Sequence, residues 1–468
     1  MKGGIDQPLA QTQVRSFVTR TAKLNSLSDA LIANAASSQS NLLNLLNQET
    51  MGDTTYESFW ISNSVSIKNA TPDLIQRIAE LPEVEEIHQE VFIELEPIVE
   101  GEEMALMGNV EWGVATVAAD KVWAQGNSGE GILVGSIDTG VLVSHESLKD
   151  NYVGAAKNGW YDPYDKSATP NDGNGHGTHT MGTIVGTNGI GVAPGAKWLA
   201  CKGCSSRGCT EAALVGCGQY ILCPTDTDGK NKNCALAPHV SSNSWGGGRG
   251  QRFYDKVVNA WRAADIVPVF ANGNSGPRCK SANSPGDYET VIGVGASTID
   301  NGLASFSSVG PAVSGLVKPD VSAPGLNVRS AWHTGDNAYK AISGTSMACP
   351  HTAGVIALML AKKGTMRYDD IYDSITASAT IHGLVRPGST CGGVSEYDYP
   401  NNAFGFGIIH AENAIAHMNG SLQPRPTDAP QPNPGPVKCV WDDNQKTCLP
   451  KDKCKKSGWW NPSKCVKK

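Results

Sequence analysis

The stretch G-T-S-M-A-C-P-H, from Gly344 to His351, decides how this chain folds and what it does. It places Ser346 on a Gly-Thr turn directly before the apolar run A-G-V-I-A-L-M-L-A at residues 353–361. We interpret that run as a buried helix. The amino end of a helix stabilises negative charge, so a serine there suits a nucleophile that generates an oxyanion. A simple N-cap at Thr345 or Ser346 would account for the same residues without any chemistry.

Two upstream segments contain the groups that such a serine needs. V-G-S-I-D-T-G, residues 134–140, is an apolar run that predicts a buried strand, with Asp138 at the end where α/β sheets collect functional groups. N-G-H-G-T-H-T-M-G-T-I-V-G, residues 174–186, holds His176 between two glycines before a helix-like stretch. Each has a plainer interpretation: Asp138 could close a turn, and we expect His179 to be structural.

The three residues occur in the order Asp138, His176, Ser346. A serine hydroxyl needs a base to take its proton, and the base needs a partner that orients it and stabilises its charged form. The same chain order is found in subtilisin, and all three segments resemble those around the triad of subtilisin-like (S8 family) serine peptidases. The resemblance implies a serine endopeptidase, a hydrolase that cleaves peptide bonds of polypeptide substrates through an acyl-enzyme.

A fourth segment resembles the family's oxyanion-binding stretch A-A-G-N. It reads V-F-A-N-G-N-S-G at residues 269–276. Aligned on Gly273, it makes Asn274, rather than Asn272, the side-chain donor, and the second donor would be the backbone N–H of Ser346. A turn asparagine in a glycine-rich loop is the alternative for Asn274.

A fifth segment, V-S-S-N-S-W-G-G-G at residues 240–248, resembles the family's substrate-binding strand. Such a strand pairs through its backbone with an extended peptide. The resemblance implies that substrate is bound by Ser244, Trp245, Gly246 and Gly247. Trp245 could equally be a core residue. The far wall of the pocket is expected at Ala282, Asn283 and Ser284.

Between these motifs, apolar strands alternate with helical runs. Strands are predicted at residues 132–137, 266–271 and 291–296. This pattern predicts an α/β catalytic domain over residues 110–420, a subtilisin-like mostly parallel sheet with helices on both faces.

Residues 1–109 are predicted to be a propeptide region. A helical segment over residues 11–48 is followed by a small α+β domain at about residues 55–97. Its expected elements are a strand from Thr55 to Lys68 with Phe59, Ile61, Val65 and Ile67 inward, a helix opened by Pro72 and ended by Pro82, and strands at residues 84–87 and 91–95.

A β-α-β unit in this position resembles the propeptides of the family, which act as intramolecular chaperones and inhibitors. Together with N-G-W-Y-D at residues 158–162, it is most similar to the bacillopeptidase F-like branch. These features imply a zymogen, with cleavage expected between Pro97 and Asn109. A free-standing N-terminal domain with another role is the alternative.

The C-terminal part changes composition. Residues 421–437 are predicted to be a Pro-rich linker, and residues 438–468 a small Cys-rich module that is too short to fold without cross-links. Its tryptophans suit a polysaccharide, and its nine lysines against three aspartates suit an anionic matrix. A second hypothesis is therefore a carbohydrate- or matrix-binding protein in which this module provides the main function; a small disulfide stub is the plainer alternative.

The thirteen cysteines are an odd number. Cys349, beside Ser346 in sequence, is the expected unpaired thiol, because removing it leaves even sets of eight in the catalytic region and four in the tail. Even sets indicate disulfide bonds and a secreted protein. The C-x-x-C spacing of Cys201 and Cys204 leaves zinc as an alternative. The eight are Cys201, Cys204, Cys209, Cys217, Cys223, Cys234, Cys279 and Cys391.

Composition excludes some partners. A net charge of −7 and a pI near 5.8 argue against nucleic acid as a main partner. The sequence contains no apolar run of about 18 residues, so we predict no transmembrane helix. Residues 1–7 have no apolar signal region, so a secretory signal is expected upstream or already removed. We expect a monomer that needs no cofactor and has no metal site. Structural calcium is common in the family, but no Asp-rich loop indicates it here.

Overall fold

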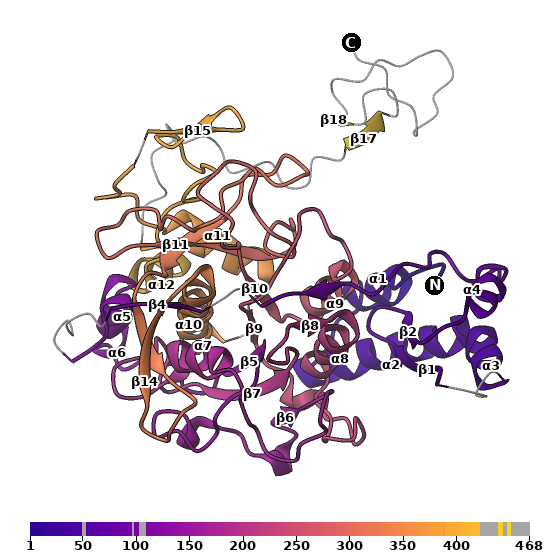
Figure 1. Ribbon diagram of the computed structural model, residues 1–468. Helices are drawn as coiled ribbons and strands as arrows, with labels where there is room; N and C mark the ends of the chain where they lie inside the picture. Colours follow the sequence, from indigo (N-terminus) through magenta and orange to yellow (C-terminus); the bar gives the residue numbers. More distant parts are fainter. Residues whose placement is uncertain are drawn as a thin grey trace.

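The computed structural model describes residues 1–48, 53–95, 98–102, 109–364, 366–386 and 388–421, together with the backbone of residues 439–442 and 447–450 (Figure 1). The predicted linker and the side chains of the predicted C-terminal module lie outside these ranges, apart from Ser421. Residues 97 and 103–108, much of the interval in which cleavage is expected, lie outside them too. In the tail, the backbones of β17 (Cys439–Asp442) and β18 (Thr447–Pro450) pair in antiparallel fashion.

A seven-stranded sheet forms the centre of the molecule, and every neighbouring pair in it is parallel. The strand order is β12-β11-β10-β9-β5-β7-β6, which confirms the predicted α/β class with a mostly parallel sheet. The bounds are β5 Leu133–Asp138, β6 Trp160–Tyr161, β7 Lys197–Lys202, β9 Val240–Asn243, β10 Val267–Ala271, β11 Ile292–Ser297 and β12 Val321–Pro324.

Helices cover both faces of the sheet, which explains why its strands read as continuous apolar runs. One face shares a core with α7 and α10, and the other packs against α8 and α9. The first sixteen residues of α10 are all buried, as expected for a helix that is enclosed on every side. The bounds are α7 His176–Val185, α8 Glu211–Leu222, α9 Asp255–Ala263 and α10 Thr345–Lys363.

The parallel register brings the carboxyl ends of three strands together. Ile137 of β5 and Phe270 of β10 both lie opposite Asn243 of β9. Asp138 therefore ends β5 beside the point where Ser244 leaves β9. Because loops at this edge start side by side, motifs that are far apart in the sequence can converge there.

A second, smaller sheet has the order β13-β14-β4 and lies beside α7 and α10 (Figure 1). Its third strand comes from the N-terminal region and pairs with β14 in antiparallel fashion. These strands are β13 Val328–Ala331, β14 Tyr339–Ser343 and β4 Val99–Glu100. The remaining short elements are α5 Trp112–Thr116, α6 Ala119–Trp123, α11 Tyr368–Ala377, α12 Ala411–Met418, β15 Thr390–Cys391, β16 Val394–Ser395 and the 3-10 turns Lys149–Asn151, Ala155–Lys157 and Cys234–Leu236.

The first two N-terminal helices pack on the α8–α9 side of the sheet, whereas the third packs against α4 (Figure 1, indigo). Leu24, Leu27 and Leu31 of α2 are completely buried in the same cluster as residues of α8 and α9. Lys23 also pairs with Asp265 at 2.6 Å. The helices are α1 Asp6–Gln13, α2 Arg20–Ser38 and α3 Ser40–Gln48, in agreement with the predicted helical segment.

The single strand predicted from Thr55 to Lys68 is wrong. The segment forms an antiparallel hairpin of β1 (Thr55–Phe59) and β2 (Ser64–Lys68). Asn63, with φ of 50°, adopts the left-handed conformation that lets the chain turn. Of the four residues expected inward, Phe59 and Ile61 are buried, whereas Val65 and Ile67 are only half-buried.

The predicted β-α-β unit is also incomplete. Its helix, α4 (Pro72–Ala79), begins at Pro72 as predicted. Residues 84–87 form no strand, because Val84 donates its N–H to Leu81 in the turn after α4. From residues 91–95, only β3 (Phe92–Ile93) is a strand, and it pairs with β8 (Cys209–Thr210) rather than within the N-terminal region.

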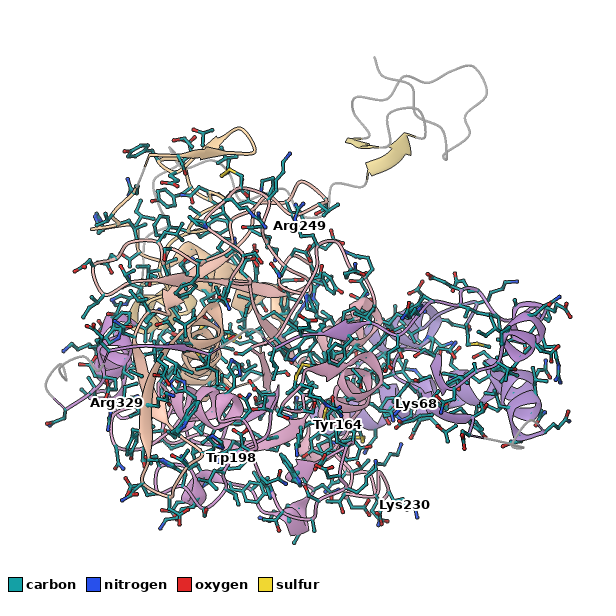
Figure 2. The ribbon with its side chains drawn as sticks, in the orientation of Figure 1. Lys68, Tyr164, Trp198, Lys230, Arg249 and Arg329 are labelled. Carbon is teal, nitrogen blue, oxygen red and sulfur yellow. A yellow bond between two sulfur atoms is a disulfide. The ribbon has the colours of Figure 1, made fainter. Side chains whose placement is uncertain are left out.

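Four disulfides join the eight cysteines of the catalytic region: Cys201–Cys217, Cys204–Cys209, Cys223–Cys234 and Cys279–Cys391 (Figure 2). Cys349 is free and buried, as predicted. The zinc alternative is wrong, because both cysteines of the C-x-x-C pair are in disulfides. Over the described ranges, none of the helices combines the length and the apolar character that crossing a bilayer requires.

We expect the four disulfides to contribute unequally to stability. Cys279–Cys391 spans 112 residues, whereas Cys204–Cys209 spans five. Loop-closure entropy then predicts a loss of about 5 kcal/mol for the long loop and about 2 kcal/mol for the short one. Urea unfolding of the two double-serine variants, each on an inactive background, measures the difference; an equal loss in both would contradict it.

Candidate active site

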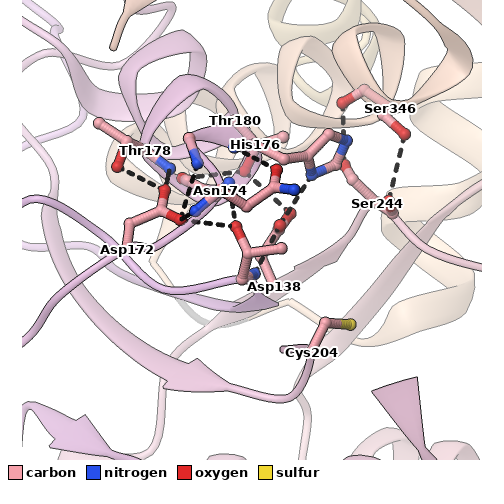
Figure 3. Close-up of polar contacts among 12 residues, drawn as sticks. Asp138, Asp172, Asn174, His176, Thr178, Thr180, Cys204, Ser244 and Ser346 are labelled. Carbon is pink, nitrogen blue, oxygen red and sulfur yellow. Dashed lines mark hydrogen bonds and ion pairs between the residues drawn. The ribbon is translucent and has the colours of Figure 1, made fainter. Parts of the chain in front are cut away.

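The predicted aspartate and histidine meet at the edge of the sheet. His176 is the first residue of α7, and its Nδ1 lies 2.7 Å from Oδ1 of Asp138 at the end of β5 (Figure 3). An ionised carboxylate only accepts hydrogen bonds, so Nδ1 carries the proton and Nε2 keeps a free lone pair. The backbone N–H of Thr139 and the hydroxyl of Thr180 also donate to Asp138, which is 3 % exposed.

These surroundings change how readily the imidazole takes a proton. Burial lowers the pKa of His176, but the charge of Asp138, its hydrogen bond and then the charge of Asp172 together raise that pKa above its ordinary value. The imidazolium form is therefore stabilised inside the site.

Asp172 is a residue of this site that the sequence analysis missed. Its Oδ1 accepts from the hydroxyl of Thr139 and the N–H groups of Asn174 and Gly175, and its Oδ2 accepts from the N–H and hydroxyl of Thr178 (Figure 3). One carboxylate thus ties the loop after β5 to the start of α7. An acidic residue shortly before a helix that starts at a functional histidine is the signal that could have identified it.

The loop after β5 also approaches α7 very closely. A Cβ on Gly177 would lie 2.1 Å from the backbone oxygen of Gly140, so only glycine fits there. The hydroxyl of Thr139 accepts from the N–H of the same glycine at 2.9 Å. The glycine after His176 therefore permits the close approach of these two backbones.

Ser346 lies in the first turn of α10, directly after Gly344 and Thr345. The helix start therefore directs its positive end at the serine, as predicted. The Ser346 side chain is 9 % exposed and faces the imidazole of His176 (Figure 3). Both residues line the same pocket. The structure thus brings together all three residues of the predicted triad.

Asn274 lines this pocket as well, and its orientation is fixed by Thr345. Its Oδ1 accepts from the backbone N–H of Thr345 at 2.8 Å and from the hydroxyl at 2.9 Å. Because a backbone N–H can only donate, the oxygen is identified and the amide NH2 remains for another partner. Asn272 instead is buried and donates to the backbone oxygen of Ser308 at 2.7 Å, so it is engaged in the core.

The segment after β9 forms one wall of the pocket. Two hydrogen bonds join Ser244 to Ser346. The Ser244 hydroxyl donates to the Ser346 carbonyl, and the Ser346 hydroxyl donates to the Ser244 carbonyl. Gly246 lies against the carbonyl of Ser284, and Gly247 donates to that carbonyl at 2.9 Å.

The expected far wall is present in part. Asn283 lines the pocket, whereas Ala282 and Ser284 are completely buried behind it. Trp245 lines the pocket and also belongs to the core, where its ring meets Tyr254 and Phe270 edge-on. Trp245 is therefore a core residue that also reaches the pocket wall, and its contact with substrate stays a prediction.

The chain's own N-terminal region lies across this site. Glu94, Leu95 and Ile98 line the pocket that contains His176 and Ser346. Before the pocket, β3 pairs with β8; after it, β4 pairs with β14, which ends immediately before Gly344. The described residues on the two sides of the pocket therefore pair with two different edges of the site.

Two further side chains of these motifs, those of His179 and Cys349, are completely buried. Nε2 of His179 donates to the backbone oxygens of Val328 and Lys340, and burial lowers the pKa of His179 to about 3, which agrees with a structural histidine. Cys349 lies behind the site against Ser242, and burial raises the pKa of its thiol to about 11. Within the described residues, no group of three or more His, Cys, Asp or Glu side chains is arranged to hold a metal ion.

Comparison with known proteins gives consistent matches. A family model described as the subtilase family matches residues 129–407. Bacillopeptidase F of Bacillus subtilis (strain 168) is 35 % identical over 435 residues, which cover 86 % of this chain and 29 % of that protein. Subtilisin DY of Bacillus licheniformis is 36 % identical over 281 residues, 58 % of this chain and 93 % of its own length. The cuticle-degrading serine protease of Arthrobotrys oligospora is 34 % identical over 314 residues, covering 65 % of this chain and 70 % of that protein.

Replacing Asp172 by asparagine should lower the pKa of His176. The change removes one of the two carboxylate charges that act on the imidazole. Titration of the His176 ring protons by NMR, on a Ser346→Ala background, measures the pKa. The exposed loop residue Asp228, replaced by asparagine, is the control and should leave it unchanged. An unaltered His176 pKa in Asp172→Asn would contradict this assignment.

Proposed function

The chain belongs to the subtilase family, and we propose that it is a serine endopeptidase in which Asp138, His176 and Ser346 form the catalytic triad. The observation that carries this proposal is the 2.7 Å contact between Asp138 and His176 in the pocket that Ser346 faces. The similarity to bacillopeptidase F extends well beyond the residues that the family model matches, since it covers 86 % of the chain.

In the first step, Ser346 Oγ attacks the carbonyl carbon of the peptide bond. Nε2 of His176 takes the hydroxyl proton as the C–O bond forms. Asp138 holds the imidazole in the required tautomer and stabilises the imidazolium that results, while remaining ionised. The raised pKa of His176 supports this role, because the charged intermediate is the form that the surroundings favour.

The negative charge that develops on the substrate oxygen needs donors that are already in place. We assign these to the side-chain amide of Asn274 and the backbone N–H of Ser346. The contacts of Thr345 with Asn274 support this, since they hold the amide without occupying its N–H groups. The start of α10 adds its dipole at the same point.

Collapse of the tetrahedral intermediate breaks the C–N bond, and His176 gives its proton to the leaving amine. The acyl group then remains on Ser346 as an ester. Water attacks that ester with His176 again as base, which releases the second product and restores the hydroxyl. No cofactor enters this cycle.

Substrate would bind as an extended chain between two backbone edges. The N-terminal segment supports this mode, because it pairs with β8 before the pocket and with β14 after it. Main-chain pairing of this kind provides affinity for many sequences. Ser244, Trp245, Gly246 and Gly247 would contact the residues before the cleaved bond.

We further propose that the chain is a zymogen whose N-terminal region inhibits it until cleavage. A segment that fills the pocket beside His176 and Ser346 excludes other substrates. The packing of α2 against α8 and α9 would hold the inhibitor in place. Disulfides in the catalytic region support function outside the cytosol, and we propose a secreted enzyme.

A fluorophosphonate probe tests the nucleophile. After processing of the N-terminal region, the wild-type enzyme should be labelled, because the probe reacts only with an activated serine. Ser346→Ala should not be labelled, whereas the exposed control Ser314→Ala should react like wild type. Equal labelling of wild type and Ser346→Ala, read by gel fluorescence, would refute the assignment.

Variants of the two asparagines test the oxyanion donor. Asn274→Leu should lower kcat by about 100- to 1000-fold with a smaller change in KM, because it removes a donor used in the transition state. Asn272→Ala is the matched control and should retain kcat within about tenfold, since its amide already bonds to Ser308. Steady-state kinetics on a fluorogenic peptide decide between them, and the opposite order would assign the role to Asn272.

A further inference from the structure

The segment that lies across the site shows how residues on the far side of Ser346 are held. Leu95 and Ile98 both line the pocket, while residues 99–100 pair with β14. Because β14 ends just before Gly344, residues from Ile98 onward lie where a substrate continues after its cleaved bond. The contacts of β4 therefore give an observed example of recognition on that side.

The first of these contacts is apolar. Ile98 packs against the cluster formed by Trp112, Val328, Trp332, Ile342 and Met347. With β4 in place, Trp332 is 7 % exposed and Met347 is 1 % exposed, so an aliphatic side chain completes this apolar cluster. A polar side chain placed there would lose water without gaining a hydrogen bond.

The second contact is main-chain pairing. Val99 lies opposite Ser343, and Glu100 lies opposite Ile342. The N–H of Gly101 donates to the carbonyl of Ala341 at 2.9 Å. Val99 itself is 52 % exposed, so its side chain is not recognised.

The third contact is electrostatic. Nζ of Lys340 lies 2.5 Å from Oε1 of Glu100 and 4.9 Å from the centre of the Trp332 ring. The ring positions the lysine through a cation–π contact. The hydrogen bond from Lys340 and its charge hold the pKa of Glu100 below its ordinary value, so the carboxylate is ionised at neutral pH. Successive side chains of a strand alternate, which places residues 98 and 100 on one side and residue 99 on the other.

We propose that Trp332 and Lys340 determine specificity after the cleaved bond, selecting an aliphatic residue at the position of Ile98 and an acidic residue two positions later. This rests on the proposed endopeptidase function and deepens it. Preferred substrates are polypeptides that carry an aliphatic–any–acidic sequence downstream of the cleavage point. The β13–β14 hairpin recognises this sequence through the apolar cluster, main-chain pairing with β14 and the ammonium group of Lys340.

Peptides that copy the chain's own segment test the proposal. The parent peptide has the sequence of residues 92–102, F-I-E-L-E-P-I-V-E-G-E. One derivative has lysine at the position of Glu100, and another has aspartate at the position of Ile98. Activated full-length wild type, Lys340→Glu and Lys157→Glu are compared; Lys157, on a 3-10 turn outside the β13–β14–β4 sheet, gives the same change in charge. The measured quantity is the ratio of kcat/KM for the parent over each derivative, so a general loss of activity in one variant cancels.

Wild type should prefer the parent over the lysine peptide by about three- to tenfold, since exposed charge pairs are modest in strength. The preference should shrink at high salt. Lys340→Glu should invert the kcat/KM ratio of the parent over the lysine peptide, and Lys157→Glu should leave that ratio unchanged. The aspartate peptide should be cleaved at least tenfold less efficiently than the parent, and Trp332→Phe should reduce that discrimination.

Equal ratios in wild type and Lys340→Glu would overturn the proposal, as would a failure to cleave the parent peptide by an enzyme that reacts with the fluorophosphonate. These outcomes differ from failure of the proposed function. In that case the processed wild-type chain would neither react with the probe nor cleave an unfolded protein such as casein.

Discussion

The hydrogen bond between Asp138 and His176 joins the end of a strand to the beginning of a helix, and the remaining geometry of the site depends on this junction. It requires β5 and α7 to approach closely, which the glycine at position 177 permits. It also requires the loop between them to be rigid. Asp172 holds that loop by accepting from five donors, which lie directly after β5, just before α7 and in the first turn of α7. The carboxylate that holds the loop also helps to raise the pKa of the His176 imidazole through its charge.

The N-terminal region uses the same edges that a substrate would use. Its extended part pairs with β8 and β14, and its helices bury leucines of α2 against α8 and α9. The two kinds of contact have different consequences. Backbone pairing positions a chain with little regard for its sequence, whereas apolar packing provides most of the free energy that keeps it bound. The paired strands of this region would therefore block the site, and the packing of its helices would keep the region bound.

The elements that could be predicted are those in which local pattern and tertiary environment agree. β5, β10 and β11 are buried on both faces, so their apolar runs identified them. The hairpin β1–β2 was read as one strand because alternation continues through the turn, and only the backbone of Asn63 shows that the chain reverses. The segment at residues 84–87 has a strand-like composition but no partner edge, and a strand without a partner does not form. Asp172 was missed because its one local signal, an acidic residue shortly before the helix that starts at His176, does not show that five donors meet there.

The sequence by itself determined the identity and order of the reactive groups, the α/β class and the odd cysteine, because these follow from residue types, spacing and count. Only the tertiary structure decided which groups surround them. The parallel register places Asp138 beside Ser244, the contact with Thr345 orients Asn274, and the pairing of β4 with β14 brings Glu100 to Lys340. Each of these depends on residues that are far apart in the chain. Distances between such residues are set by how strands and helices pack, and local sequence does not contain that information.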